Sequence, residues 1–270
     1  MRSSDLEWFG LRSAPFSKEI ADDDLWLPSS KVELVDELEE AIEARASVLL
    51  TGEPGVGKTC VLRALRKRLS PDDYRLTYCH NATLGRRDFY RQLCVALGLA
   101  PSATAAAVFY AVSTHVEELG KERVHPVFLL DEAHLLHQDV LDHLHILLNY
   151  QWDSRALLSL VLIGLPELET QLERRRNRSL YTRIHHRCVI DDATASDTTE
   201  YISYRLGLAG ATKSLFAGDA IELLHEHVAG SLRDLDRLAQ AAMRDTARRK
   251  KKTVDRDAVA RVLGGRMPIA

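Results

Sequence analysis

Hydrophobic and polar positions follow one pattern through the first two thirds of the chain. Short apolar runs, typical of buried strands, alternate there with stretches whose apolar residues have helical spacing. The runs lie at residues 47–51, 74–79, 127–130 and 158–164, and the helical stretches at 59–69, 87–97, 103–119 and 140–149. Strands and helices in alternation predict an α/β fold, with a parallel sheet flanked by helices.

Near residue 191 the pattern becomes purely helical. Helical spacing covers residues 197–206, 218–228, 232–248 and 255–263, and Gly207, Gly230 and Gly264 follow three of these stretches. Asp197 and Glu200 resemble the start of the first helix. The sequence therefore predicts an N-terminal linker and first helix at residues 1–46, an α/β domain at 47–192 and a small all-helical domain at 193–270.

A glycine-rich turn lies between the first strand and the helix that follows it. Residues 52–59 read GEPGVGKT and fit the G-x-x-x-x-G-K-[ST] pattern of a phosphate-binding loop. Glycines let backbone N–H groups close around phosphate oxygens at a helix start. Lys58 is expected to reach the β- and γ-phosphates, and the Thr59 hydroxyl to ligate Mg²⁺. The predicted ATP-binding residues are Gly52, Glu53, Pro54, Gly55, Val56, Gly57, Lys58, Thr59 and Cys60.

Two carboxylates follow another apolar strand, in VFLLDEAH at residues 127–134. Four consecutive apolar residues are typical of a strand buried on both faces of a parallel sheet, and ligands bind at the carboxyl ends of such strands. Asp131 is predicted to hold Mg²⁺ through its water shell, and Glu132 to orient the attacking water. Acidic residues at a strand end can also serve solubility, but together with the phosphate loop they indicate ATP hydrolysis.

Composition narrows the classes of protein. The 270 residues are 46% hydrophobic and 28% charged, which is ordinary for a globular protein. We find no apolar run of membrane-spanning length and no apolar signal core at the N-terminus, so no membrane contact is expected. Cys60, Cys79, Cys94 and Cys188 lack paired or metal-like spacing, which indicates reduced thiols and a cytoplasmic location. His134, His137, His143 and His145 lack a third close ligand, so no metal besides magnesium is predicted.

The formal net charge of −3 argues against binding nucleic acid by bulk charge. Basic residues nevertheless gather late in the chain, in RRRNR at residues 174–178 and RRKKK at 248–252. Such runs are either solvated helix faces or contacts to phosphates, and the sequence leaves both alternatives open.

These features together resemble the AAA+ ATPases, a family of P-loop proteins with a helical lid domain behind the sheet. FGLRSAPF at residues 9–16 and LLNYQWDS at 147–154 are similar to one group of that family. So are LVLIGLPELE at 160–169 and GSLRDLDRLAQAAM at 230–243. The group contains the secretion ATPase ExeA and the transposon target-selection ATPases TnsC, TniB and MuB. The resemblance extends from about residue 8 to residue 263.

The resemblance implies roles for several further residues. An arginine before the lid would act on the nucleotide of a neighbouring subunit, with Arg183 as first candidate and Arg178 as second; either could instead solvate a helix end. Arg233 resembles the sensor-two arginine that couples the lid to the nucleotide.

Leu165 stands where the family has a polar sensor-one residue, so slow hydrolysis is expected, and Asn149 is a candidate substitute. Pro15 and Phe16 either contact adenine or pack within the protein.

The implied function is an ATP-dependent ATPase of DNA transposition. It would form a homo-oligomeric ring or helical filament on duplex DNA, independently of sequence, and recruit a transposase. Asn81, Thr83, Arg86 and Arg87 are candidate DNA contacts. One alternative is a secretion-associated, ExeA-like ATPase, for which we expect a membrane span and a wall-binding domain after the lid. The other is an ATP-binding scaffold that does not hydrolyse ATP.

Overall fold

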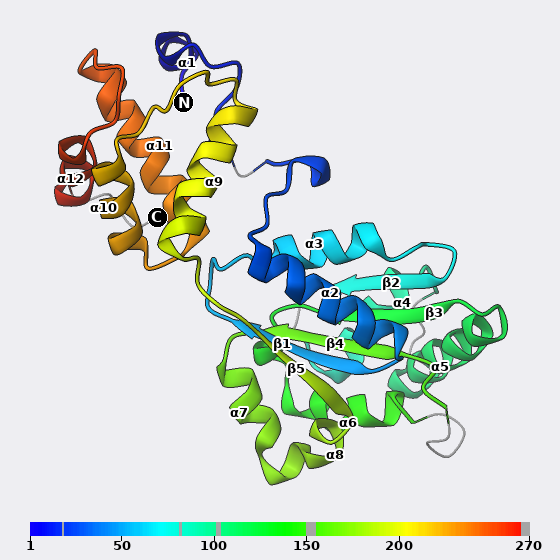
Figure 1. Ribbon diagram of the computed structural model, residues 1–270. Coiled ribbons are helices and arrows are strands. Elements are labelled where there is room, and N and C mark those ends of the chain that lie inside the picture. Colours follow the sequence, from blue (N-terminus) through cyan, green and yellow to red (C-terminus); the bar gives the residue numbers. More distant parts are fainter. Residues whose placement is uncertain (18, 81–82, 101–103, 150–154, 266–270) are drawn as a thin grey trace. The chain divides into compact units, whose positions relative to one another are not determined.

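The computed structural model describes residues 1–17, 19–80, 83–100, 104–149 and 155–265. Its residues divide into two compact units (Figure 1). Ser29–Glu53 and Lys58–Ile190 form the α/β unit. Met1–Pro28, Pro54–Gly57 and Asp191–Ala270 form the helical unit. Within the described residues, no helix is both long and apolar enough to cross a membrane.

The α/β unit is built on a five-stranded parallel sheet with the order β2-β3-β4-β1-β5. The strands are β1 (Ser47–Gly52), β2 (Tyr74–Cys79), β3 (His125–Leu130), β4 (Ser159–Gly164) and β5 (Ile184–Ile190). Every residue of β1, β3 and β4 is buried, because helices cover both faces of the sheet. The predicted α/β fold with a parallel sheet flanked by helices is confirmed.

Helices lie on both faces of this sheet. They are α2 (Ser29–Glu43), α3 (Lys58–Arg68), α4 (Arg86–Ala96), α5 (Ala105–Lys121), α6 (Gln138–Leu147), α7 (Glu167–Glu173) and α8 (Arg178–Tyr181). Figure 1 shows α2 and α3 on one face and α6 to α8 on the other. Phe128 and Leu160 pack in one cluster with residues of α4 to α8, whereas alternate strand residues point to the opposite face. Each fully buried leucine or phenylalanine side chain contributes roughly 1.5–3 kcal/mol to stability.

The helical unit consists of α1 (Ser3–Phe9), α9 (Ala195–Leu208), α10 (Gly218–Val228), α11 (Leu232–Arg248) and α12 (Arg256–Gly264). The start predicted for α9 was wrong by two residues. Thr194 caps this helix: its Oγ1 accepts the Asp197 N–H at 3.1 Å, and the Asp197 carboxylate accepts the Thr194 N–H at 2.9 Å. Asp197 is thus the third helical residue, because the threonine three positions earlier completes the capping box.

The segment before α2 is anchored in the helical unit by Arg205, whose side chain is only 3% exposed. Its Nε and Nη2 donate to the carbonyl oxygens of Pro15 and Ser17, both at 2.7 Å. Phe16 is buried between these contacts and meets the Phe216 ring edge to face, at 6.0 Å between centroids. Its position favours packing within the helical unit over a contact with adenine.

Candidate nucleotide-binding site

The carboxyl end of the sheet, where the strands finish, gathers most of the predicted chemistry of the α/β unit. Gly52 ends β1, Asp131 and Glu132 follow β3, and Leu165 follows β4. Since β3, β4 and β1 are neighbours in the parallel sheet, the residues after them lie along one line. The motifs that are distant in sequence therefore meet here.

Lys58 is the first residue of α3, and its amine lies against the base of the loop. Nζ donates to the carbonyl oxygens of Gly52 at 2.7 Å and Glu53 at 3.0 Å. Gly55 and Gly57 have φ angles of 92° and 104°, a region that side chains disfavour. The loop thus has the backbone conformation that its glycines predict, and Thr59 is exposed in the first turn of α3.

Within the helical unit, Gly55 lies against the start of α11. A Cβ atom added at Gly55 would collide with Ser231 Oγ and would lie 3.3 Å from Arg233 Cβ. Only glycine therefore fits at this position. The predicted sensor-two arginine lies beside Gly55, on the first turn of α11.

Asp131 is buried, at 8% exposure, and is held by two hydrogen bonds. Tyr78 Oη donates to Oδ2 at 2.6 Å, and the Glu132 N–H donates to Oδ1 at 2.9 Å. Burial and this hydrogen bond to the carboxylate raise the pKa of Tyr78 far above its ordinary value, so the phenol remains protonated and donating. Sequence analysis missed Tyr78, whose role depends on β2 being the neighbour of β3.

Glu132 is half exposed and has a left-handed backbone conformation, with φ 54° and ψ 34°. This conformation costs roughly 1–2 kcal/mol for a residue with a side chain. His134 Nε2 lies 3.6 Å from a carboxylate oxygen of Glu132, and His134 Nδ1 accepts the Leu165 N–H at 3.4 Å. A Cβ at Gly164 would lie 3.2 Å from His134 Nδ1, so the absent side chain makes room for the ring. His134 thereby connects the ends of β3 and β4.

The amino end of the sheet, where the strands begin, holds the arginine predicted to act on a neighbour. Arg183 precedes β5 and lines a cavity of about 330 Å³ with Arg45, Arg155 and His185. Its Nη1 donates to the Ser179 carbonyl at 2.9 Å. Strands of six or seven residues separate this cavity from the carboxyl end by about 20 Å.

Asn149 also belongs to the amino end of the sheet. It follows Leu148, which lines the same cavity, whereas α6 begins six residues after Glu132 and extends for 10 residues. A helix of that length is about 15 Å long. The structure thus does not bring Asn149 to Glu132, and its position gives no support for a sensor role.

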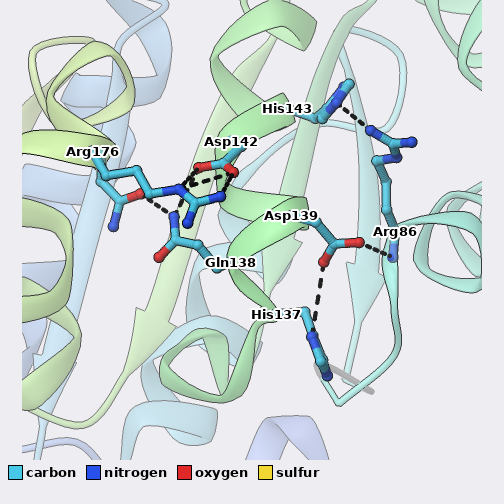
Figure 2. A network of polar contacts seen from close by, with 8 residues as sticks. Arg86, His137, Gln138, Asp139, Asp142, His143 and Arg176 are labelled. Atoms are coloured by element: carbon cyan, nitrogen blue, oxygen red, sulfur yellow. Dashed lines mark hydrogen bonds and ion pairs between the residues drawn. The ribbon is translucent and has the colours of Figure 1, made fainter.

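Helix α6 ties the predicted DNA contact Arg86 into a polar network (Figure 2). The Arg86 N–H donates to Asp139 Oδ2 at 3.3 Å, and Arg86 Nη1 lies 2.5 Å from His143 Nε2. Burial and the adjacent guanidinium lower the pKa of His143, which keeps the ring neutral beside Arg86. Thr83 and Arg87 lie in the same segment, and Asn81 falls outside the described residues.

The same helix holds the first basic run, as the left side of Figure 2 shows. Arg176 contacts both carboxylate oxygens of Asp142, with Nη2–Oδ2 at 2.5 Å, and Gln138 Nε2 donates to Asn177 Oδ1 at 2.5 Å. The hydrogen bond from Arg176 lowers the pKa of Asp142. Arg176 therefore serves the fold, while Arg178, at the start of α8, is exposed.

The second basic run is also partly committed to internal contacts. Arg249 pairs with Asp245 at 3.2 Å, and Lys251 pairs with Asp255 at 2.6 Å. Lys252 Nζ lies 3.9 Å from the centroid of the Trp8 ring. These contacts hold three members of the run against other residues of the protein. Among the described residues, no three His, Cys, Asp or Glu side chains form a metal-binding group.

Comparisons with known proteins find relatives of this chain and of its fold. Residues 39–172 match the family model described as AAA domain. General secretion pathway protein A of Aeromonas hydrophila is 31% identical over 240 residues, which cover 88% of this chain and 44% of that protein. The chain therefore spans less than half the length of this relative.

Two solved structures have the same fold. Drosophila ORC bound to DNA matches with a TM-score of 0.71 and 21% identity, over 97% of this chain and 65% of that one. The Aeropyrum pernix ORC2 protein, in its ADPNP-ADP complexes, matches with a TM-score of 0.68 and 15% identity, over 95% of this chain and 72% of that one. At these identities the likeness concerns the fold.

Proposed function

We propose that this chain, whose residues 39–172 form an AAA domain, is an ATPase that assembles with copies of itself on duplex DNA. One observation carries the proposal. The carboxyl end of the sheet holds Lys58, Asp131 and Glu132, whereas Arg183 lies at the amino end, about 20 Å away. Each copy thus presents most of an ATP site at one end and a cation that completes such a site at the other.

The phosphate loop and the start of α3 would hold the phosphates of ATP. Backbone N–H groups at a helix N-terminus favour anions. Lys58 would exchange the carbonyls of Gly52 and Glu53 for phosphate oxygens, which are stronger, charged acceptors. The structure of the Aeropyrum ORC2 protein with ADPNP and ADP supports nucleotide binding by this fold.

Asp131 and Thr59 are the proposed ligands of Mg²⁺. Both offer oxygen atoms, and Mg²⁺ is bound by one or two carboxylates together with substrate phosphates. The buried Asp131 carboxylate, already fixed by two donors, fits such a role. When bound, the metal would neutralise charge on the phosphates.

Glu132 is the proposed base that orients the attacking water. Its carboxylate is half exposed at the carboxyl end of the sheet and is approached by His134 Nε2. The Leu165 side chain offers no hydrogen bond, so the proposal includes slow hydrolysis, as suits a switch better than a motor. Arg233 would report the nucleotide state to the helical unit through its place beside Gly55.

Arg183 is the proposed arginine that completes the site of the adjacent copy, with Arg178 as second candidate. Stabilisation of the charge on the γ-phosphate by such an arginine accelerates hydrolysis by about 10³–10⁵-fold in related systems. Binding of one end of the sheet to the other end of the next copy is a head-to-tail contact, which generates rings or helical filaments.

DNA transposition in the cytoplasm is the proposed setting, with a transposase as partner. The four sequence stretches that resemble the group containing ExeA and the transposon target-selection ATPases support it, and so does the fold shared with Drosophila ORC, which is bound to DNA. Thr83, Arg86 and Arg87 would contact phosphates without reading bases.

A secretion-associated role is the second candidate. It is favoured by the 31% identity to General secretion pathway protein A. A scaffold that binds ATP without hydrolysis is favoured by Leu165. Turnover that is lost in Glu132→Gln would reject the scaffold, and DNA binding that depends on ATP would favour transposition over secretion.

The proposal is tested by binding of a labelled duplex of arbitrary sequence with ADP, with ATP and with a non-hydrolysable ATP analogue, across a salt series. We expect cooperative binding that requires the triphosphate and weakens steeply with salt. Absence of DNA binding with every nucleotide at low salt would overturn the DNA part of the proposal.

A further inference from the structure

We propose that the helical unit carries a second contact for nucleic acid, a cavity between α1 and α11 that receives backbone phosphates. This α1–α11 cavity has a volume of about 330 Å³ and is lined by Met1, Arg2, Asp5, Arg244 and Arg248. The inference rests on the proposed binding of DNA and extends it from Thr83, Arg86 and Arg87 to a different part of the molecule.

The charge around the cavity is positive. Three arginines and one aspartate line the cavity, and the Asp5 carboxylate accepts a hydrogen bond from the Arg2 backbone N–H at 3.2 Å, at the start of α1. Arg244 Nη2 donates to the neutral Gln240 Oε1 at 3.0 Å. In the part of the chain that the structure describes, no carboxylate forms an ion pair with Arg2, Arg244 or Arg248.

Two neighbouring arginines of the helical unit, by contrast, are paired with a carboxylate. Asp245 pairs with both Arg249 and Arg261, at 3.2 and 2.7 Å. Arg244 and Arg248 are four residues apart on α11, so they lie one turn apart on the same face. Two like charges in adjacent turns cost stability unless an anion joins them, which points to a ligand rather than to a role in folding.

The walls of the cavity are fixed before any ligand arrives. Trp8 Nε1 donates to the Lys251 carbonyl at 2.8 Å, and Lys252 packs on the Trp8 ring. Leu6 and Phe9 pack on the core of the helical unit. Because these contacts hold α1 beside the end of α11, little backbone ordering remains to oppose binding.

The lining selects the chemical class of ligand. A guanidinium group binds phosphate through two parallel hydrogen bonds. Apart from Met1, the lining residues are charged, and none of them is an aromatic side chain on which a base could stack. A lipid headgroup is disfavoured because Leu6 and Phe9 face the protein core instead of presenting an apolar face to acyl chains. Backbone phosphates of a nucleic acid fit this chemistry best.

The test compares two double variants of the full chain. Arg244→Gln with Arg248→Gln removes two cavity cations, and Lys213→Gln with Arg256→Gln removes two exposed cations elsewhere in the helical unit. Duplex binding is measured with a non-hydrolysable ATP analogue across a salt series. We expect the cavity variant to bind about tenfold or more weakly at low salt, with the slope of log K against log salt reduced by about 2. The control variant should keep the wild-type slope.

Other outcomes separate this inference from the proposed function. Wild-type protein that binds no DNA would overturn both. Wild-type binding with unchanged affinity and slope in the cavity variant would overturn the inference alone. It would also be overturned if the cavity variant lost binding to vesicles of anionic phospholipid while binding DNA as the wild type does. Equal ATP affinity in the two variants and the wild type shows that each is folded.

Discussion

The two ends of the parallel sheet handle charge in opposite ways. At the carboxyl end the charged groups already have partners: Lys58 is held by carbonyls, Asp131 by a phenol, and Glu132 lies near an imidazole. At the amino end Arg183 lines a cavity whose described lining includes two further arginines, a histidine and no carboxylate. One end combines a lysine with two carboxylates, and the other is lined by arginines.

This difference teaches that a single copy is an incomplete enzyme under the proposed function. The rigid sheet keeps its two ends about 20 Å apart, so Arg183 cannot reach the phosphates bound by its own chain. A second copy in head-to-tail contact would bring the two ends together. Each variant below removes a group from one end.

Lys58→Ala should have the largest effect, because it removes the cation of the carboxyl end, and without bound ATP every later step is lost. We expect affinity for ATP to fall by at least about 100-fold, since charge-assisted hydrogen bonds to phosphate are worth about 1.5–3 kcal/mol each. Titration with a fluorescent ATP analogue measures the loss. Lys67→Ala, exposed in the last turn of α3, is the matched control. Undiminished affinity in Lys58→Ala would refute the phosphate-loop interpretation.

Arg183→Ala removes the proposed catalytic arginine from the amino end of the sheet. We expect ATP turnover to fall by about 10³-fold while ATP affinity is retained, because the arginine acts on the charge of the reacting phosphate in another copy. Mixing Arg183→Ala with Lys58→Ala protein should restore part of the activity, since one intact composite site can form.

Arg178→Ala serves as the comparison for this arginine. A large loss of ATP turnover in Arg178→Ala, with none in Arg183→Ala, would assign the role of the arginine acting on the neighbouring copy to Arg178. Mixtures that recover no activity would argue against a site shared between copies.

Glu132→Gln keeps the shape of the carboxyl end but removes its base. Turnover should fall by about 10²-fold, the lower range for loss of a general base, while the ATP-bound assembly persists. Phosphate release and the lifetime of the DNA complex are the measurements. Glu167→Gln, exposed at the start of α7, is the control. Equal turnover in the wild type and Glu132→Gln would favour the scaffold alternative.

The smallest expected effect concerns His125, and it is measured in the free energy of unfolding. It begins β3 at the amino end of the sheet, and burial lowers its pKa to about 4. In the unfolded chain His125 becomes protonated below about pH 6.5, whereas in the folded chain it stays neutral down to about pH 4. The free energy of unfolding should therefore decrease by up to about 3 kcal/mol as the pH falls from 6.5 to 4.

Urea unfolding at several pH values measures this dependence. His125→Gln should flatten it, whereas His186→Gln, at an exposed position of β5, should leave it unchanged. A wild-type stability that is constant between pH 4 and 6.5 would contradict the prediction.

Local sequence predicted those features that local sequence determines. β3 and β4 read as continuous apolar runs because both of their faces are buried, and the phosphate loop follows from glycine geometry and one lysine. β5 was not predicted as a range, because it lies at the sheet edge and exposes His185, His186 and Arg187. Its sequence therefore lacks an apolar run.

Features that depend on strand order could not be predicted in the same way. Tyr78 meets Asp131 only because β2 pairs with β3, and His134 meets the Leu165 N–H only because β3 pairs with β4. Residue type alone makes Asn149 a candidate sensor. The length of α6 carries it to the other end of the sheet.

The hydrogen bond between Tyr78 and Asp131 has a consequence for the order of binding events. The phenol donates to one oxygen of the carboxylate proposed for the metal. A free divalent cation, held through water, would share this oxygen with the phenol and would lack the phosphates that supply its remaining ligands. We therefore expect the protein to discriminate against free Mg²⁺ and to capture the metal already bound to ATP, so that the concentration of the metal–nucleotide complex controls occupancy.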